Sequence, residues 1–213
     1  SAPTDIGNTN RTNQDRYHGR VYRSNVGKIV FSVLCDGMGG FDHGEIASAY
    51  VVRSFFNWAD ARLATVLASD NPDSLLRSDW SRLIDHCNEA IAQFAARGRL
   101  VMGTTLTAML ITPQRYTIVN VGDTRAYVIA EELRQLTYDQ TVVAHEVRQG
   151  ILTPEEAKRD PRRNVLLQCI GASEDVYPDF FFGGTRENVV YMMCTDGFRN
   201  ELTEEELFTY LHP

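Results

Sequence analysis

Two apolar segments that lie far apart in the chain each end in an Asp-Gly pair. Residues 29–35 (IVFSVLC) lead into residues 36–40 (DGMGG), and residues 189–194 (VVYMMC) lead into residues 195–197 (TDG). Short runs rich in β-branched residues and ended by glycine are typical of buried strands. Each strand therefore delivers one carboxylate into a tight loop, and two such carboxylates indicate a site for hard cations. The alternative is two ordinary Asp-Gly turns.

The length and charge of the chain restrict the classes of function. Its 213 residues, 43% of them hydrophobic, suffice for one domain with a sizeable core. The net charge of −7 gives a nucleic-acid partner no electrostatic support, and no apolar run is long enough to span a membrane. The 4 cysteines form no C-x-x-C pair, so we expect free thiols in a reducing cytoplasm rather than a zinc site. We also expect a monomer.

Apolar residues at helical spacing predict two long helices. The first begins near residues 43–45, and its apolar stripe is formed by Ala47, Val51, Phe55 and Trp58. The second covers residues 80–96, and one face of it carries Trp80, Leu83, Ile84, Cys87, Ile91 and Phe94. We interpret residues 59–79 as partly loop, because they contain the sequence DNPD. Both stripes are interpreted as core faces rather than cofactor sites.

Three further strands are predicted at residues 104–111, 116–121 and 125–129. The connections between them are too short for crossovers, so we expect antiparallel hairpins. Capping boxes that begin at Thr153 and Thr203 predict the starts of two later helices. Because a strand meander needs cover, helices packed on antiparallel sheets are the expected architecture.

Seven short motifs give the chain a resemblance to a known family. In order, they are TDIG at residues 4–7, NQD at 13–15, DGMGG at 36–40, GEIAS at 44–48, GTTLT at 103–107, GDTR at 122–125 and TDG at 195–197. Each motif alone is weak, but together they resemble bacterial members of the PPM family, the metal-dependent type 2C serine/threonine protein phosphatases. The resemblance implies an α+β fold, a four-layer α/β/β/α sandwich in which two antiparallel sheets are flanked by helices.

The resemblance implies metal-binding roles for five residues. Asp36 would bridge two Mn²⁺ or Mg²⁺ ions, the Gly37 carbonyl would bind the first ion, and Asp196 would bind the second. Asp15 would help to hold the water shell of the first ion, and Asp123 would form a third, weaker site with Asp196. Two ions about 3.5–4 Å apart can activate a water molecule for in-line attack on phosphorus. The alternatives are a plain hairpin residue for Asp123 and a turn cap for Asp15.

Arg11 is the candidate phosphate ligand, and it completes a predicted catalytic set with Asp36 and Asp196. Family members carry an arginine three residues before the asparagine of the NQD motif, where this chain has Asn10. Arginine suits phosphate because its planar guanidinium can form two parallel hydrogen bonds. A one-residue shift along a strand reverses the face of the side chain, unless a bulge corrects it. The alternative is a solvent-facing arginine.

Two segments near the C-terminal end depend on the same resemblance. Residues 147–171 match the family's flap, and five cations there could attract a phosphopeptide or form a solvated surface: Arg148, Lys158, Arg159, Arg162 and Arg163. The family's late Gly-x-Asp-Asn motif, which supplies another metal ligand, does not occur before Pro213. We therefore expect residues 1–213 to form a single phosphatase catalytic domain that lacks its C-terminal helix and closing strand.

The expected activity is metal-dependent hydrolysis of phosphoserine and phosphothreonine in proteins, opposing a serine/threonine kinase. Phosphorylated proteins, the substrates of such a kinase, are the expected partners. One alternative is a pseudophosphatase that binds phosphoproteins, which the missing late aspartate favours and the retained Asp36, Asp123 and Asp196 oppose. Another alternative is a phosphatase of a partner-switching pathway that acts on a single phosphoserine protein.

Overall fold

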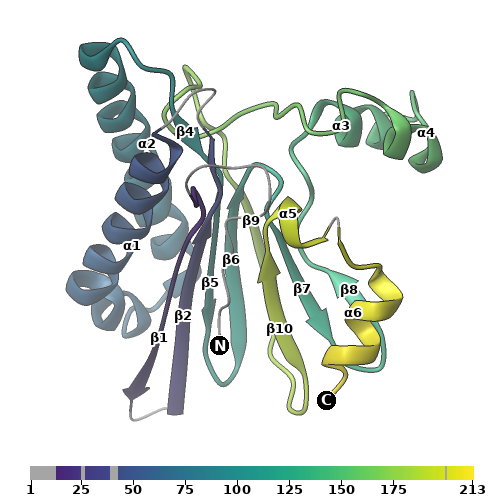
Figure 1. Cartoon of the computed structure of the whole chain (residues 1–213). Coiled ribbons are helices and arrows are strands. Elements are labelled where there is room, and N and C mark those ends of the chain that lie inside the picture. Colours follow the sequence, from purple (N-terminus) through teal and green to yellow (C-terminus); the bar gives the residue numbers. More distant parts are fainter. Residues whose placement is uncertain (1–12, 25–26, 39–42, 200) are drawn as a thin grey trace.

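The computed structural model describes residues 13–24, 27–38, 43–199 and 201–213, and Figure 1 shows how its layers are arranged. Helices α1 (Gly44–Leu67) and α2 (Pro72–Gly98) cover one face of a five-stranded antiparallel sheet. A three-stranded antiparallel sheet packs against the other face, and helix α6 (Glu204–Leu211) lies beside it. This order of layers confirms the expected α/β/β/α sandwich.

The two sheets contain nearly all of the strands. The first has the order β1 (Arg16–Ser24), β2 (Gly27–Cys35), β5 (Leu106–Ile111), β6 (Arg115–Val121) and β9 (Asp179–Gly184). The second has the order β10 (Val190–Cys194), β7 (Arg125–Ile129) and β8 (Leu133–Gln135). A short separate ladder pairs β3 (Gly37–Met38) with β4 (Gly103–Thr104). The remaining helices are α3 (Val142–Arg148), α4 (Pro154–Arg159) and α5 (Asp196–Arg199).

The central strand β5 is buried on both faces, and this explains its continuous apolar sequence. Ala108 and Leu110 point into the core beneath the helices, whereas Met109 lies in the core between the sheets. Successive side chains of a strand point to opposite faces, so a strand with a helix layer on one side and a sheet on the other needs apolar residues on both. Ile118 of β6 and Val128 of β7 pack in the same core between the two sheets.

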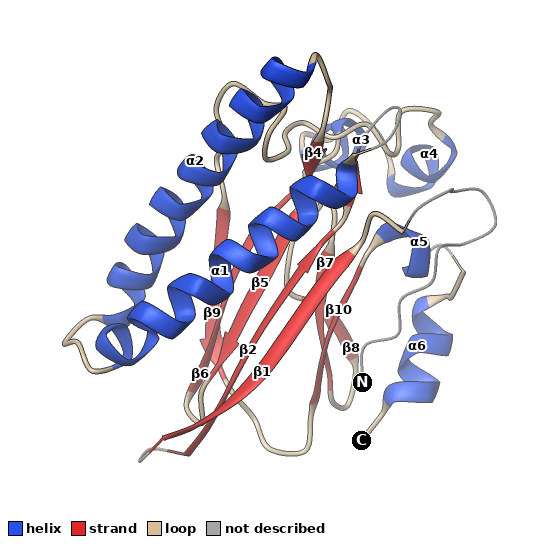
Figure 2. Ribbon diagram, turned by 60° about the vertical axis from the view of Figure 1, so that its left-hand side comes forward, coloured by secondary structure: helices blue, strands red, loops and turns tan. Residues whose placement is uncertain are grey.

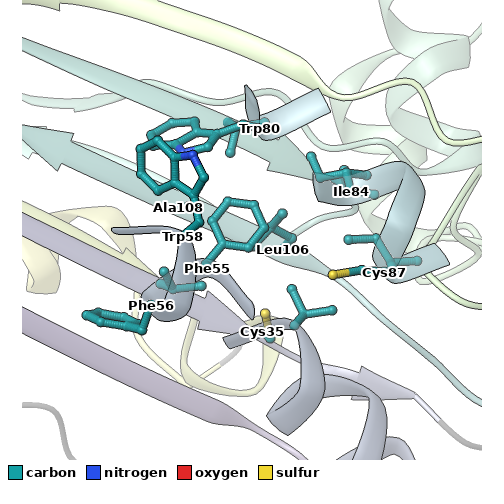
Figure 3. Close-up of a cluster of buried hydrophobic side chains, with 14 of the residues drawn as sticks. Cys35, Phe55, Phe56, Trp58, Trp80, Ile84, Cys87, Leu106 and Ala108 are labelled. Atoms are coloured by element: carbon teal, nitrogen blue, oxygen red, sulfur yellow. The ribbon is translucent and has the colours of Figure 1, made fainter. Parts of the chain in front are cut away.

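Aromatic side chains dominate the core between the helices and the first sheet. Phe31 of β2 stacks on Trp80 of α2 with a ring-centroid distance of 5.9 Å, and Trp58 of α1 meets Trp80 edge-on at 5.5 Å. Phe55 adds a tilted ring 6.0 Å from Trp80, and Figure 3 shows Phe55, Trp58 and Trp80 in this buried cluster. Trp80 is therefore the side chain that joins α1, α2 and β2.

The two long helices are longer than the sequence patterns predicted. Helix α1 continues to Leu67 and α2 begins at Pro72, so the loop predicted within residues 59–79 is confined to residues 68–71, and the predicted start of the second helix at residue 80 is wrong. The DNPD sequence is a helix start, because the Asn71 side chain caps the Ser74 amide at 3.2 Å and Pro72 occupies the first turn. Phe94 is also misplaced by the prediction: it is 52% exposed, and the neighbouring Ala95 takes the buried position.

The predicted strands are present, but one predicted hairpin is wrong. Strands β5 and β6 form an antiparallel hairpin as expected, whereas β6 and β7 belong to different sheets. The turn at Gly122 and Asp123 therefore carries the chain across the sandwich. Gly122 has φ 98°, and a Cβ there would come within 2.6 Å of the Thr105 side chain, so this crossing requires glycine. The capping boxes at Thr153 and Thr203 are confirmed.

Replacing Trp80 with alanine should lower the free energy of unfolding by about 3–5 kcal/mol, because a fully buried aromatic side chain leaves a cavity. Phe94→Ala on the same helix is the matched control and should change it by no more than about 0.5 kcal/mol. Urea unfolding of both variants, followed by circular dichroism, measures the difference. Equal losses in the two variants would contradict the assigned faces of α2.

Candidate metal-dependent active site

The backbone of Asp36 is held in place by the segment that joins β4 to β5. Its amide donates to the Thr105 hydroxyl at 2.9 Å, and its carbonyl accepts from the Thr105 amide and the Thr104 hydroxyl, both at 2.9 Å. The Thr105 hydroxyl also bonds to the hydroxyl of Thr124 at 2.7 Å, which links this segment to the crossing between the sheets. Asp36 therefore leaves the end of β2 on a rigid support.

Gly37 brings three parts of the chain into close contact. Its amide donates to the carbonyl of Gln14 at 3.2 Å, and the Ser48 hydroxyl donates to the same carbonyl at 2.7 Å. A Cβ at Gly37 would collide with the carbonyl of Gly44 and would lie 2.6 Å from that of Gln14. Glycine is required here because backbone approaches backbone, with no flexible side chain that could move aside. The contact places the segment before β1 against the start of α1 and the end of β2.

Asp15 and Asp196 reach the same region from opposite ends of the chain. The Thr195 hydroxyl donates to Asp15 Oδ2 at 3.0 Å, and the carboxyl groups of Asp15 and Asp36 lie close enough for each to shift the pKa of the other. Asp196 follows strand β10 and is the first residue of α5, so its Asp-Gly pair begins a helix rather than a simple turn. The structure thus brings together three of the predicted residues: Asp15 just before β1, Asp36 just after β2, and Asp196 at the start of α5.

Burial and like charges together determine the protonation of this cluster. Burial is the largest cause that raises the pKa of Asp36, followed by the charges of Asp15, Asp196 and Asp123, and the result is a pKa of about 8. Burial also raises the pKa of Asp15, and the charge of Asp196 adds to this. Four carboxylates therefore lie close enough to repel one another, an arrangement that a cation would relieve.

The chemistry of these residues fits Mn²⁺ or Mg²⁺ ions that keep part of their water shell, rather than an ion whose ligands all come from the protein. Within the described ranges, no three His, Cys, Asp or Glu side chains are arranged to hold one ion by themselves. Mg²⁺ usually keeps several waters and binds through only one or two carboxylates. Asp36 with the Gly37 carbonyl, and Asp36 with Asp196, would supply such sparse ligand sets, and Asp15 would hold waters of the first ion.

Asp123 belongs to the same electrostatic cluster but has a cationic partner of its own. Burial raises its pKa to about 6, while the guanidinium of Arg199 opposes this shift. Arg199 Nη2 lies 3.1 Å from Asp123 Oδ2. Because the chain crosses between sheets at this point, the interpretation of Asp123 as a plain hairpin residue is wrong.

Of the predicted cations, one is not among the described residues and two already have partners. Arg11 lies outside the described residues. In the flap, Arg162 forms paired hydrogen bonds with Glu146 and also binds Asp160, which lies two residues before it. Arg148 donates to the backbone carbonyl of Asp139 at 3.0 Å.

Three flap cations have no such partner. They lie in or next to the helical segment α3–α4, which projects from the sandwich. Lys158, Arg159 and Arg163 form no ion pair with a described residue. Figure 1 shows α3 and α4 projecting from the sandwich on the side of α5. These three side chains are therefore the remaining candidates for the predicted attraction of a phosphopeptide.

Sequence reasoning missed the residues that support the acidic cluster. Thr195 stands directly before Asp196 in the sequence, and this adjacency was an available signal, whereas Thr104 and Thr105 lie in the GTTLT motif, far along the chain from every predicted aspartate. Gln14 acts through its backbone carbonyl, which its side-chain type does not reveal. Arg199 could have been found only by recognising that residues 196–199 are helical, because the helix places it one turn after Asp196.

Comparison with known proteins assigns this fold and site to a class. The sequence profile of the family "Protein phosphatase 2C" matches residues 7–213. The serine/threonine phosphatase stp of Listeria monocytogenes is 31% identical over 208 residues, which are 96% of this chain and 79% of the relative. The protein phosphatase PhpP of Streptococcus pneumoniae is 32% identical over 210 residues, with 96% and 80% covered.

Solved structures agree with the sequence relatives. The serine/threonine phosphatase of S. agalactiae superimposes with a TM-score of 0.84 at 30% identity, over 99% of this chain and 84% of that one. The catalytic domain of PstP, a serine/threonine phosphatase solved with two manganese ions, gives a TM-score of 0.69 at 30% identity over 92% and 83%. The fold is thus that of the serine/threonine phosphatase class. The chain belongs to the protein phosphatase 2C family, as its motifs predicted.

The metal-free protein should become less stable as the pH rises from 5 to 8. Unfolded Asp36 ionises near 3.8, whereas the folded, metal-free protein keeps its proton up to about pH 8. Unfolding therefore releases a proton between these values, and stability falls by up to about 1.4 kcal/mol per pH unit. Asp36→Asn removes this proton release, so the variant should gain stability relative to the wild type with rising pH. Urea unfolding in EDTA tests this, and a pH-independent difference between the two proteins would refute it.

Gly37→Ala should destabilise the protein by more than about 2 kcal/mol, because its Cβ meets backbone that cannot yield. Gly197→Ala is the matched control from the second Asp-Gly pair. A Cβ at Gly197 meets no described atom within 4 Å, and alanine favours the helix there. Thermal unfolding of the two variants distinguishes them, and similar melting temperatures would contradict the close contact at Gly37.

Proposed function

We propose that this protein hydrolyses phosphoserine and phosphothreonine in other proteins, with two Mn²⁺ or Mg²⁺ ions held at Asp36. Asp36 would bridge the ions, with the Gly37 carbonyl on one and Asp196 on the other, and Asp15 would bind the first ion's waters. The observation that carries the proposal is the burial of Asp36 among three further carboxylates. Such a cluster is costly without cations and is suited to divalent ones.

The relatives support both parts of the proposal. The Listeria, streptococcal and mycobacterial relatives are named as protein phosphatases, most of them specifically as serine/threonine phosphatases. The PstP catalytic domain was solved with two manganese ions. This naming favours an enzyme over a pseudophosphatase, and no relative reported above favours the partner-switching alternative.

The residues of this chain would position the reaction rather than form a covalent intermediate. Bound ions supply the positive charge that neutralises phosphate and lowers the pKa of a water molecule. Thr104 and Thr105 fix the backbone of Asp36, so its carboxylate needs little reorganisation when charge develops. Thr195 orients Asp15 through a 3.0 Å hydrogen bond. Arg11 is proposed to bind the phosphate oxygens by its guanidinium fork.

The flap is proposed to help recruit the substrate. Lys158, Arg159 and Arg163 form no ion pair with a described residue, so their charge is available to an acidic phosphopeptide. A serine/threonine kinase would phosphorylate the same substrates. We further propose that residues 1–213 form one catalytic domain that acts as a monomer in the cytoplasm. Among the described helices, none combines the length and the apolarity that a membrane crossing needs.

Asp36→Asn should lower kcat at least a hundredfold, because the charge that bridges the two ions is removed. Asp175→Asn, at an exposed position distant in sequence from the cluster, is the matched control and should retain wild-type kcat. The assay follows phosphate release from a phosphothreonine peptide, and from p-nitrophenyl phosphate, with Mn²⁺ and with EDTA. Wild-type turnover in EDTA, or comparable turnover by Asp36→Asn in Mn²⁺, would overturn the two-ion mechanism.

A further inference from the structure

Arg199 is a buried cation that contacts the predicted third metal position. Its Nη2 lies 3.1 Å from Asp123 Oδ2, and its Nη1 donates to the Asp123 backbone carbonyl at 3.1 Å. The side chains of Arg199 and Asp123 are 12% and 8% exposed. The guanidinium therefore binds both the side chain and the backbone of Asp123, and both side chains are largely shielded from solvent.

A second carboxylate balances the charge of Arg199. Arg199 Nη1 lies 2.9 Å from Asp139 Oδ2, and Arg125 binds both oxygens of Asp139 at 2.8 and 2.7 Å. The ion pairs hold the pKa of Asp139 below its ordinary value despite its burial. Two guanidinium groups and two carboxylates thus form a network that is neutral in total without any metal ion.

The helical geometry of α5 places Arg199 where a third ion would be shared. Asp196 and Arg199 are three residues apart in α5, so they lie on the same side of the helix. The charges of Asp196 and Arg199 both act on Asp123. A third ion between Asp123 and Asp196 would therefore have a fixed positive charge as its neighbour.

We propose that Arg199 takes the place of a third divalent cation at Asp123, so that this protein holds two ions and not three. The inference rests on the proposed function, because it presupposes the two-ion site at Asp36. Asp123 Oδ2 is already an acceptor for the guanidinium, and like charges at such distances repel. An ion on Asp123 Oδ2 would displace Arg199 and leave a buried guanidinium with one partner fewer, and an ion on Oδ1 would lie beside the same positive charge. Arg199 also joins α5 to the crossing between the sheets, and so positions Asp196 with or without metal.

The experiment counts Mn²⁺ ions bound per chain, by equilibrium dialysis and by isothermal titration calorimetry. Arg199→Gln should bind one more ion than the wild type, and adding Asp123→Asn to it should remove that ion. Arg125→Gln is the matched control, because it removes a guanidinium from the same network without a described contact to Asp123. That control should bind the same number of ions as the wild type.

The single variant Asp123→Asn provides an independent test if Arg199→Gln fails to fold, as judged by circular dichroism. An unchanged ion count in Asp123→Asn supports the proposal, whereas the loss of one ion overturns it. Equal counts in the wild type and a folded Arg199→Gln also overturn it. A wild type that binds no Mn²⁺ and releases no phosphate would instead refute the proposed function, so the two failures are distinguishable.

Discussion

Burial of the Asp36 carboxylate among other carboxylates is unfavourable, and much of the structure serves to maintain it. A pKa of about 8 means that the metal-free protein prefers to keep this group protonated. The backbone of Asp36 cannot relax away from its neighbours, because Thr104 and Thr105 hold both its amide and its carbonyl. The cost is offset by the large aromatic core beneath the helices.

The layered fold explains how carboxylates from distant parts of the sequence meet. Strand β2 of the first sheet and strand β10 of the second both end near residues 14–15, which precede β1. Figure 2 shows the two sheets side by side. The chain crosses between the sheets at the same edge, and Thr105 bonds to both Asp36 and Thr124 there. Packing of two sheets therefore converts strand ends into one site, while the rest of the sandwich supplies rigidity.

Much of the fold could be predicted from sequence, because strand and helix patterns report burial directly. The apolar run at residues 29–35 and the stripe around Trp80 are local signals of this kind. The errors have physical causes. Asn71 and Pro72 form a helix cap that resembles a loop sequence, and Gly122 permits a crossing between sheets that resembles a hairpin turn.

Asp36, Asp123 and Asp196 were recognisable because a glycine stands beside each, and Asp15 because the NQD motif resembles the family, but the residues that support them were not. Backbone carbonyls such as that of Gln14 have no side-chain signature, and neither has the close contact of Gly37 with Gly44. Arg199 was missed because its role depends on tertiary structure: its partners Asp123 and Asp139 lie in distant parts of the sequence. Local patterns therefore reveal candidate ligands, whereas the charge balance around them requires the folded chain.

The structure neutralises buried carboxylates in two different ways, and the difference suits the proposed chemistry. Asp139 is permanently paired with Arg125, and Asp123 with Arg199. By contrast, no lysine or arginine of the described residues forms an ion pair with Asp36. A guanidinium at Asp36 would neutralise its charge, but its N–H donors would be occupied by the carboxylate and could not bind water or phosphate. An exchangeable divalent ion leaves coordination positions for water and phosphate, so fixed cations at the edge of the cluster and none at its centre are what a hydrolase of this kind requires.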